Sequence, residues 1–255
     1  MFRKCLILVG VVLLVASASR AEPMRTLLCK ENKLPGVQKL ELGVVAQYTE
    51  ISKDNLLLLG GGDEYWATPY VRYGALENLA LFASVPYGQI EPELGGSESG
   101  LGDVSVGFEL VGYQDVLGYP WVMPHLAVSL DTGDEETGLG SGNTVVTPGV
   151  SIGTTVDNIF HWVLDARYAF NNSDEDGGNV ASIQGAFIWD LSEQFSLLVE
   201  GRASDENRWG VGHPAWFQAG MTYKATENLM FGAYGGGGQN AREDTFASLK
   251  VAYTF

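Results

Sequence analysis

The chain has 255 residues, of which 45% are hydrophobic and 11% aromatic, while only 18% are charged. It is too aromatic and too weakly charged to be disordered, and two cysteines are too few for a disulfide scaffold. Acids outnumber lysine and arginine by 31 to 15, which excludes a nucleic-acid-binding protein because such surfaces are basic. The 33 glycines and the many aromatic residues favour an all-β protein with frequent turns.

The first 21 residues have the pattern of a signal peptide. Arg3 and Lys4 form a basic start, and residues 5–18 form an apolar core that is followed by small residues suited to cleavage. A single membrane-spanning helix is the alternative, but it needs about 20 apolar residues, and this run is shorter. We therefore expect export with removal of residues 1–21, which leaves Cys29 as the one cysteine of the mature chain.

Residues 22–38 come next and show no clear alternation of apolar and polar side chains. We assign them to an N-terminal segment that precedes the first strand. A short helix outside the main domain and a plug inserted into that domain are both compatible with this stretch. The sequence does not decide between them.

From residue 39 to residue 255, apolar and polar residues alternate with a period of two, which is the period of a β-strand. This pattern predicts twelve strands, and no other run of the mature chain approaches 18 apolar residues. Transmembrane β-strands need roughly 9–11 residues, so the predicted lengths suit a membrane barrel. The strands are predicted at 39–51, 65–76, 78–90, 101–113, 119–132, 144–155, 159–171, 180–190, 195–204, 213–224, 229–238 and 245–255.

The connections between these strands alternate between short and long. Three short ones share a pattern, in Glu77-Asn78-Leu79, Asp157-Asn158-Ile159 and Glu227-Asn228-Leu229. Short turns at one end and long loops at the other are typical of outer-membrane barrels, in which the short turns face the periplasm. With twelve strands, both ends of the barrel domain and residues 22–38 fall on the periplasmic side. The long connections are acidic and glycine-rich and lie at 52–64, 91–100, 133–143, 172–179, 205–212 and 239–244.

A soluble β-sandwich also has strands with period two. Its outward faces would be polar, however, whereas one face of the strand at 159–171 carries six apolar groups. These groups suit contact with lipid. We therefore predict a transmembrane antiparallel β-barrel over residues 39–255, located in the outer membrane.

If the apolar faces contact lipid, the opposite faces line the lumen. Those faces carry six acids and five bases, and this near-balance predicts ion pairs because a lone charge inside a barrel is costly. Direct contact with a passing solute stays open as the other role. Eight strands leave a filled lumen and sixteen to eighteen an aqueous one, so we expect a narrow lumen here. The lumen-lining candidates are Glu41, Arg72, Asp103, Glu109, His125, Asp131, His161, Asp165, Arg167, Glu200, Arg202, Lys224 and Lys250.

Three motifs resemble those of known proteins. The ending Val251-x-Tyr253-x-Phe255 resembles the strand by which outer-membrane proteins are recognised for insertion. The stretch from Gly100 to Gly107, with its Gly-Leu-Gly-Asp, and residues 131–143 resemble two motifs of the transporter family grouped with phenol meta-pathway degradation. This resemblance implies an outer-membrane channel for small hydrophobic or aromatic compounds.

The sequence offers little support for an enzyme or a metal site. There is no Gly-x-Ser-x-Gly motif for a lipid hydrolase, and the acidic loops lack the spacing of a calcium-binding loop. We expect no catalytic residues, no cofactor and no specific metal.

The leading hypothesis is a passive channel for small solutes. The expected partners are the solute, outer-membrane lipid, lipopolysaccharide and the outer-membrane assembly machinery. A closed structural or adhesive barrel that acts through its acidic loops is the alternative, and a lipid hydrolase is a weaker one.

Overall fold

The computed structural model describes residues 23–51, 61–113, 120–171, 178–206, 213–241 and 243–255. The predicted signal peptide lies outside these residues. The described chain forms fourteen β-strands in one sheet. They are β1 (Leu40–Ile51), β2 (Gly62–Leu76), β3 (Leu79–Ser84), β4 (Tyr87–Pro92), β5 (Glu98–Leu101), β6 (Ser105–Leu110), β7 (Trp121–Ser129), β8 (Val145–Val156), β9 (Phe160–Asn171), β10 (Val180–Asp190), β11 (Phe195–Ser204), β12 (Ala215–Lys224), β13 (Leu229–Gln239) and β14 (Glu243–Thr254).

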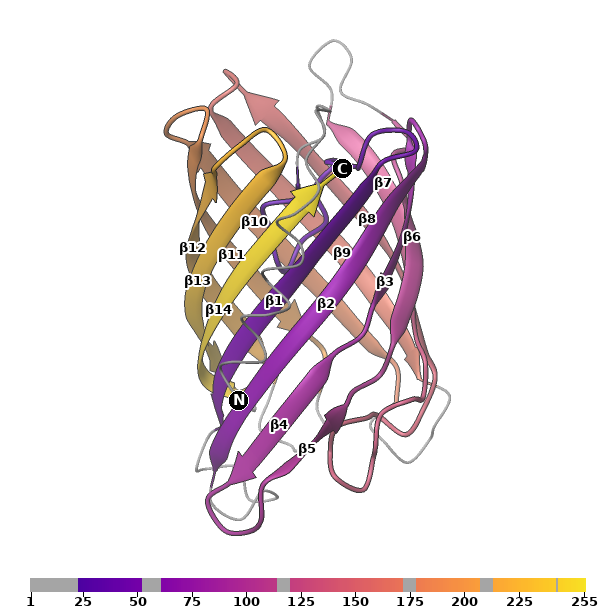
Figure 1. Cartoon of the computed structure of the whole chain (residues 1–255), viewed down its shortest axis with the longest axis vertical. Coiled ribbons are helices and arrows are strands. Elements are labelled where there is room, and N and C mark those ends of the chain that lie inside the picture. Colours follow the sequence, from indigo (N-terminus) through magenta and orange to yellow (C-terminus); the bar gives the residue numbers. More distant parts are fainter. Residues whose placement is uncertain (1–22, 52–60, 114–119, 172–177, 207–212, 242) are drawn as a thin grey trace.

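The sheet closes into a barrel because β1 pairs antiparallel with both β14 and β2 (Figure 1). β3 and β4 pair with successive parts of β2, so together they make one strand of the wall. β5 pairs with β4 and β6 pairs with β3, so these two make the next one. The fourteen segments therefore build twelve wall strands, which confirms the predicted antiparallel barrel.

Two neighbouring wall strands are interrupted, and there the predicted continuous strands were wrong. The strand predicted at 78–90 breaks at Val85–Pro86, where proline offers no N–H for a ladder hydrogen bond. The strand predicted at 101–113 begins earlier, with β5, and breaks at Gly102–Val104. The breaks lie side by side, because the Gly102 N–H donates to the Pro86 carbonyl at 2.8 Å.

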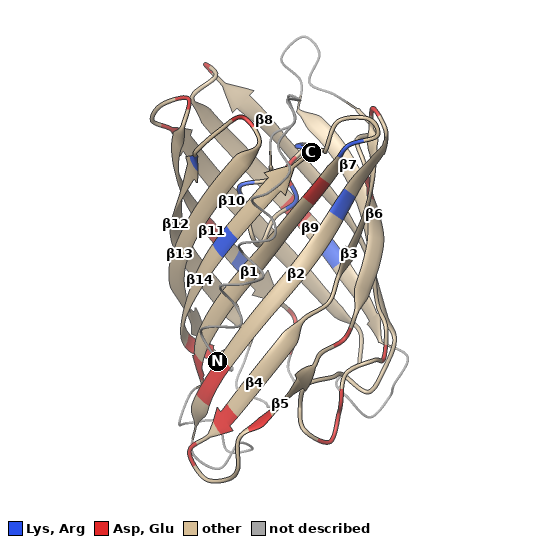
Figure 2. Cartoon of the chain, viewed as in Figure 1, with Lys and Arg blue, Asp and Glu red and all other residues tan. Residues whose placement is uncertain are grey.

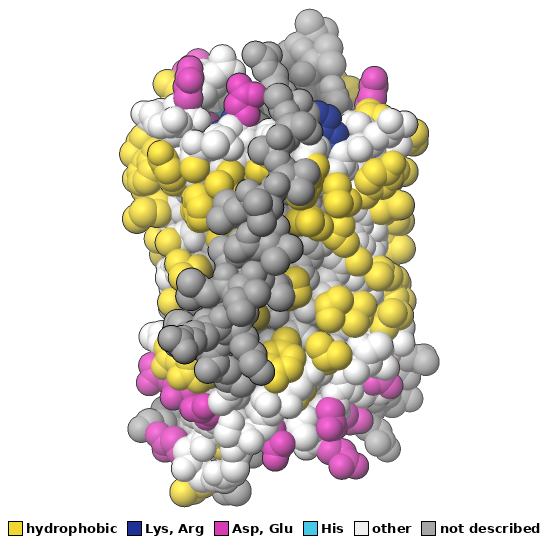
Figure 3. Space-filling view, viewed as in Figure 1, with side chains coloured by type: hydrophobic (Ala, Val, Ile, Leu, Met, Phe, Trp, Pro, Cys, Tyr) yellow, Lys and Arg dark blue, Asp and Glu magenta, His cyan; other side chains and the backbone are white. Residues whose placement is uncertain are grey.

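The two faces of the wall differ as the alternation predicts. In β9, Leu164, Tyr168 and Phe170 are exposed on the outside, while Val163 and Asp165 are buried on the inside. Exposed apolar side chains gather around the middle of the barrel, and acidic side chains lie near its two ends (Figure 3). An apolar outer band with a polar interior is the arrangement that suits a barrel in lipid. None of the described residues belongs to a helix long and apolar enough to span a membrane.

Candidate functional site

The lumen is crossed by residues 23–38, which we call the plug (Figure 1). Sequence analysis left a short helix and an inserted plug open for residues 22–38; residues 23–38 form no helix and lie inside the barrel. The plug is bonded to strands all around the wall, so it spans the lumen from side to side. These contacts come from Arg72 on β2, Glu109 on β6, Asp165 on β9, Asp190 on β10, Glu200 on β11, Tyr234 on β13 and Lys250 on β14.

One buried carboxylate holds the N–H groups of the plug. Glu200 accepts hydrogen bonds from the backbone N–H groups of Leu27 at 3.1 Å, Leu28 at 3.0 Å and Cys29 at 3.3 Å. Gln218 donates its side-chain amide to the same carboxylate at 2.6 Å. Backbone without secondary structure needs such partners when it is buried, and Glu200 supplies three of them.

Wall cations bind the plug's carbonyl oxygens in the same way. Arg167 donates to the Leu28 carbonyl at 2.7 Å, and Lys250 donates to the Met24 carbonyl at 2.7 Å. Arg72 donates to the carbonyl of Lys33, also at 2.7 Å. Figure 2 shows Lys and Arg at positions along the wall strands, away from the acidic ends of the barrel. The plug is therefore held by hydrogen bonds both to acidic and to basic side chains of the wall.

A chain of ion pairs links the plug to three wall strands. Arg72 lies between two carboxylates, 2.8 Å from Glu41 and 2.6 Å from Glu109. The Lys30 ammonium of the plug is 2.7 Å from Glu109. Glu41, Arg72 and Glu109 are buried, so each charge depends on its neighbours for compensation.

Asp165 is the centre of a second cluster. It accepts hydrogen bonds from Arg167 at 2.8 Å, from Ser151 at 3.0 Å and from the Lys30 backbone N–H at 3.0 Å. The His125 ring nitrogen lies 3.4 Å from the same carboxylate. This cluster joins β7, β8 and β9 to the plug.

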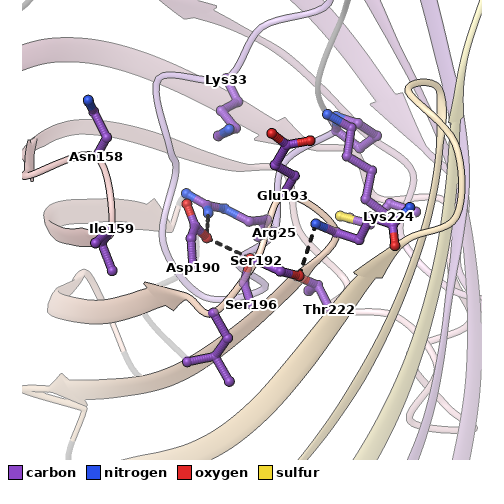
Figure 4. Close-up of a pocket in the computed structure, with 14 residues that line it drawn as sticks. Arg25, Lys33, Asn158, Ile159, Asp190, Ser192, Glu193, Ser196, Thr222 and Lys224 are labelled. Atoms are coloured by element: carbon purple, nitrogen blue, oxygen red, sulfur yellow. Dashed lines mark hydrogen bonds and ion pairs between the residues drawn. The ribbon is translucent and has the colours of Figure 1, made fainter.

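The third cluster lies at the short-turn end of the lumen. Asp190 is paired with Arg25 of the plug and with the Ser196 hydroxyl at 2.6 Å (Figure 4). The His161 ring lies 2.6 Å from the same carboxylate. Arg25 also forms an ion pair with Glu31 at 3.0 Å. The carboxylate lies between His161 and Ser196, whereas nucleophile activation needs the histidine in the middle. The group is therefore arranged as an anchor for Arg25.

Described residues of the barrel line an inner and an outer cavity. The inner cavity, at the short-turn end, has a volume of about 570 Å³ and is lined by Arg25, Lys33, Asp190 and Lys224 among others (Figure 4). The outer cavity, toward the long loops, has a volume of about 490 Å³. Its lining is mixed, with the apolar side chains of Val45, Trp66, Pro86 and Leu139 and the polar side chains of Gln47, Thr68, Asp103 and Ser141.

The outer cavity lies beside the interrupted part of the wall. β5 pairs with β4 on one edge, and no described strand pairs with its other edge. Residues 132–141, which we call the inner loop, lie against that part of the wall from inside. A Cβ atom added to Gly100 of β5 would be 3.0 Å from the Leu139 side chain, so the two are in close contact. The inner loop thus fills the lumen side of a gap in the sheet.

Asp103 fixes the inner loop. One carboxylate oxygen accepts the N–H groups of Thr132 at 3.2 Å and Gly133 at 2.9 Å. The other accepts the N–H of Ser141 at 2.8 Å and its hydroxyl at 2.6 Å. Partial burial disfavours the charged form, but these hydrogen bonds outweigh it and lower the pKa of Asp103 below its ordinary value.

The glycines of the two family-like motifs lie where backbones meet. A Cβ atom on Gly133 would be 2.6 Å from the Gly140 Cα, and one on Gly102 would be 3.0 Å from the Leu139 carbonyl oxygen. Real Cβ atoms do not approach backbone to 2.6 Å, and 3.0 Å is tighter than most real contacts. The motifs therefore build the junction between the wall and the inner loop.

The predicted lumen-lining residues fall into three groups. Glu41, Arg72, Glu109, His125, Asp165, Glu200 and Lys250 are buried inside the barrel. His161, Arg167, Arg202 and Lys224 are half-buried, and the Arg202 guanidinium lies over the Trp216 ring at 4.9 Å. Asp103 and Asp131 were placed in strands but lie in connections, Asp103 in the break before β6 and Asp131 exposed after β7. Whether any of them contacts a solute stays a prediction.

Sequence reasoning missed the charged groups that the plug brings into the lumen, namely Arg25, Lys30 and Glu31. Nothing in a stretch without periodicity signals them. Asp190 was missed as well, although it pairs across the sheet with the buried, inward-facing Ser196. In the described part of the chain, no group of three His, Cys, Asp or Glu residues could hold a metal ion.

Solved structures with a similar fold include an outer-membrane channel and small porins. The COG4313 outer membrane channel from Pseudomonas putida F1 is 12% identical, with a TM-score of 0.71 over 94% of this chain and 100% of that one. The KdgM and NanC porins are 13% and 14% identical, with TM-scores of 0.59 and 0.57. Each alignment covers 84% of this chain, and 99% and 98% of the two porins. At such identities the likeness shows a shared fold. No curated protein sequence matches the chain.

A family model matches residues 37–255, which is the whole barrel with both glycine-rich motifs. The match confirms the resemblance found in those motifs. The chain belongs to the family described as "Putative MetA-pathway of phenol degradation".

Proposed function

We propose that this chain is an outer-membrane channel for small apolar or aromatic solutes, exported with cleavage of residues 1–21. The observation that carries the proposal is the pairing of a polar plug with a partly apolar outer cavity. Polar bonds from seven wall strands hold the plug across the lumen, so the resting barrel resists the flow of ions. The outer cavity, in contrast, offers Trp66, Pro86 and Leu139 to an apolar molecule.

The route starts where the sheet is incomplete. The edge of β5 that no described strand pairs with, and the breaks beside Pro86 and Gly102, adjoin the outer cavity. An apolar solute dissolved in the membrane would reach the cavity through this part of the wall, without crossing the acidic loops. It would then pass the plug into the inner cavity. KdgM porin has been solved in complex with an oligogalacturonate, but that polar ligand differs from the solute we propose.

Proteoliposomes that contain the mature protein test this function. We expect uptake of a small aromatic probe well above that of protein-free liposomes, together with rare or small single-channel currents. A variant that lacks residues 23–38 should conduct ions steadily, because its lumen has lost the plug. If the mature protein transports neither probe nor ions and the shortened variant is equally silent, the channel function is wrong.

Two observations favour a second function. The obstructing plug and the paired lumen charges are also what a closed structural or adhesive barrel would show. In that case the acidic loops would act at the cell surface, and the aromatic probe would not cross the proteoliposome membrane faster with the protein than without it. We propose no catalytic activity and no cofactor. The membrane-insertion role of Val251, Tyr253 and Phe255, and contact with lipopolysaccharide and the assembly machinery, stay predictions.

A further inference from the structure

The inner loop and the outer cavity carry an inference that rests on the proposed channel function and adds a selectivity determinant to it. We propose that Asp103 is a positioning residue that holds Leu139 in the outer cavity, and that Leu139 limits the size of the solutes that enter it.

The first step is the geometry of the carboxylate. The donors that reach Asp103 come from both ends of the inner loop, Thr132 and Gly133 at the beginning and Ser141 at the end. One side chain therefore ties the two ends together and anchors both to the break between β5 and β6. No other described side chain carboxylate bonds to both ends of this loop.

The second step is the placement of Leu139. Most of the inner loop is exposed, yet Leu139 is only 5% exposed. Its backbone N–H donates to the Asp134 carbonyl at 2.9 Å, which turns the peptide so that the side chain lies toward Gly100 and the cavity. The position of Leu139 thus depends on how the loop as a whole is seated.

The third step is the chemistry of the clamp, by which we mean Asp103 with its hydrogen bonds to Thr132, Gly133 and Ser141. An ionised carboxylate only accepts hydrogen bonds, and here it meets three N–H groups and a hydroxyl. Asparagine at position 103 has the same shape but one acceptor oxygen, so its NH₂ group would face N–H donors. Asp103→Asn should therefore release one end of the loop and let Leu139 move out of the cavity.

A cysteine placed in the outer cavity tests the inference without depending on transport. Thr68 lines the cavity, and the buried Cys29 is replaced by serine, so Cys29→Ser/Thr68→Cys is the parent protein. It is reconstituted in liposomes and treated from outside with N-ethylmaleimide or with a maleimide carrying a bulky uncharged group. We expect the parent to react with the small reagent and only slowly with the bulky one.

Asp103→Asn and Leu139→Ala should each raise the rate with the bulky reagent about tenfold or more. In Asp103→Asn the loop loses strong hydrogen bonds to a charged group, and in Leu139→Ala the side chain that occupies the cavity is shortened. The rate with the small reagent should change little. Asp131→Asn is the matched control, since it removes a carboxylate from the same connection outside the clamp. Leu139→Ala leaves the clamp intact, so it tests the filter even if Asp103→Asn folds poorly.

Equal bulky-reagent rates in the parent and both variants would overturn the inference. A rise in Asp103→Asn without one in Leu139→Ala would also overturn it, because the loop rather than Leu139 would then limit access. The aromatic-probe uptake of the wild-type protein is a separate measurement. If neither probe nor ions cross with the mature protein, and the variant that lacks residues 23–38 is equally silent, while the size discrimination holds, the channel function is wrong and Leu139 filters access to a closed cavity.

Discussion

Glu200 illustrates how a single side chain can fix irregular backbone inside a barrel. Its carboxylate lies on β11, yet it accepts the N–H groups of three consecutive plug residues, the last of them 171 positions away in the sequence. Each carboxylate oxygen accepts two hydrogen bonds: Oε1 from Leu28 and Cys29, and Oε2 from Leu27 and Gln218. Such charge-assisted bonds contribute roughly 1.5–3 kcal/mol each, so this residue is a main anchor of the plug.

Glu200→Gln should therefore loosen the plug. The plug and Gln218 direct hydrogen-bond donors at both carboxylate oxygens of Glu200, whereas glutamine has one acceptor oxygen. The NH₂ group of the glutamine would then face other N–H donors. We expect more frequent ion currents through the full-length barrel than in the wild-type protein, recorded in planar bilayers. Glu77→Gln, which changes an exposed carboxylate at a short turn, is the control and should behave as wild type. Identical current records for the two variants would contradict an anchoring role.

The clamp residue Asp103 gives a prediction about pH. Its partial burial is outweighed by hydrogen bonds, so its pKa lies below the ordinary value of 3.8. A carboxylate whose pKa is lower in the folded loop than in the unfolded loop stabilises the folded loop at pH values above its unfolded-state pKa. This stabilisation is lost as the pH falls through the folded-state pKa. The clamp should hold at neutral pH and weaken only below about pH 4. Carboxyl ¹³C NMR titration measures the pKa of Asp103 directly. Ser141→Ala removes a hydroxyl donor and should raise this pKa. A pKa above 3.8 in the wild-type protein would refute the clamp.

At the scale of elements, the sequence predicts regular strands well and interruptions poorly. The strand predicted at 159–171 is β9 with one residue less, because six alternating apolar groups leave its register no freedom. Pro86 and Gly102 break two other predicted strands. Proline lacks an N–H and glycine lacks a side chain, and both absences disturb the hydrogen-bonded pairing of strands without changing the alternation of apolar and polar residues. The plug was undecidable because its position depends on bonds to residues more than a hundred positions away.

The inner loop provides a prediction at the same scale. Gly140→Ala would place a Cβ 2.5 Å from the Gly133 carbonyl carbon, and backbone cannot yield easily. Overpacking of this kind costs typically about 1–3 kcal/mol, so the loop should open and become sensitive to protease added outside the liposomes. Gly96→Ala is the control, because nothing lies within 4 Å of its added Cβ in the neighbouring long loop. Equal protease resistance in both variants would show that the junction has room to adjust.

For the whole molecule, the distribution of charge matters more than its sum of −16. Acids and bases pair inside the lumen, while unbalanced acids such as Asp134, Glu135 and Glu136 lie in the long loops. Once the plug is removed, the nearly balanced lumen contributes little preference for either ion. The acidic rim then sets the electric potential at the mouth of the pore.

The variant that lacks residues 23–38 should accordingly be cation-selective, and the selectivity should depend on salt. The screening length is about 10 Å at 0.1 M salt and about 3 Å at 1 M, so rim charges reach the pore axis only in dilute salt. Reversal potentials under potassium chloride gradients should favour cations at low concentration and approach zero preference at high concentration. Replacing Asp134, Glu135 and Glu136 by their amides should reduce the low-salt preference. Anion preference at low salt would instead assign the field to the lumen bases that bind the plug, among them Arg167 and Lys250.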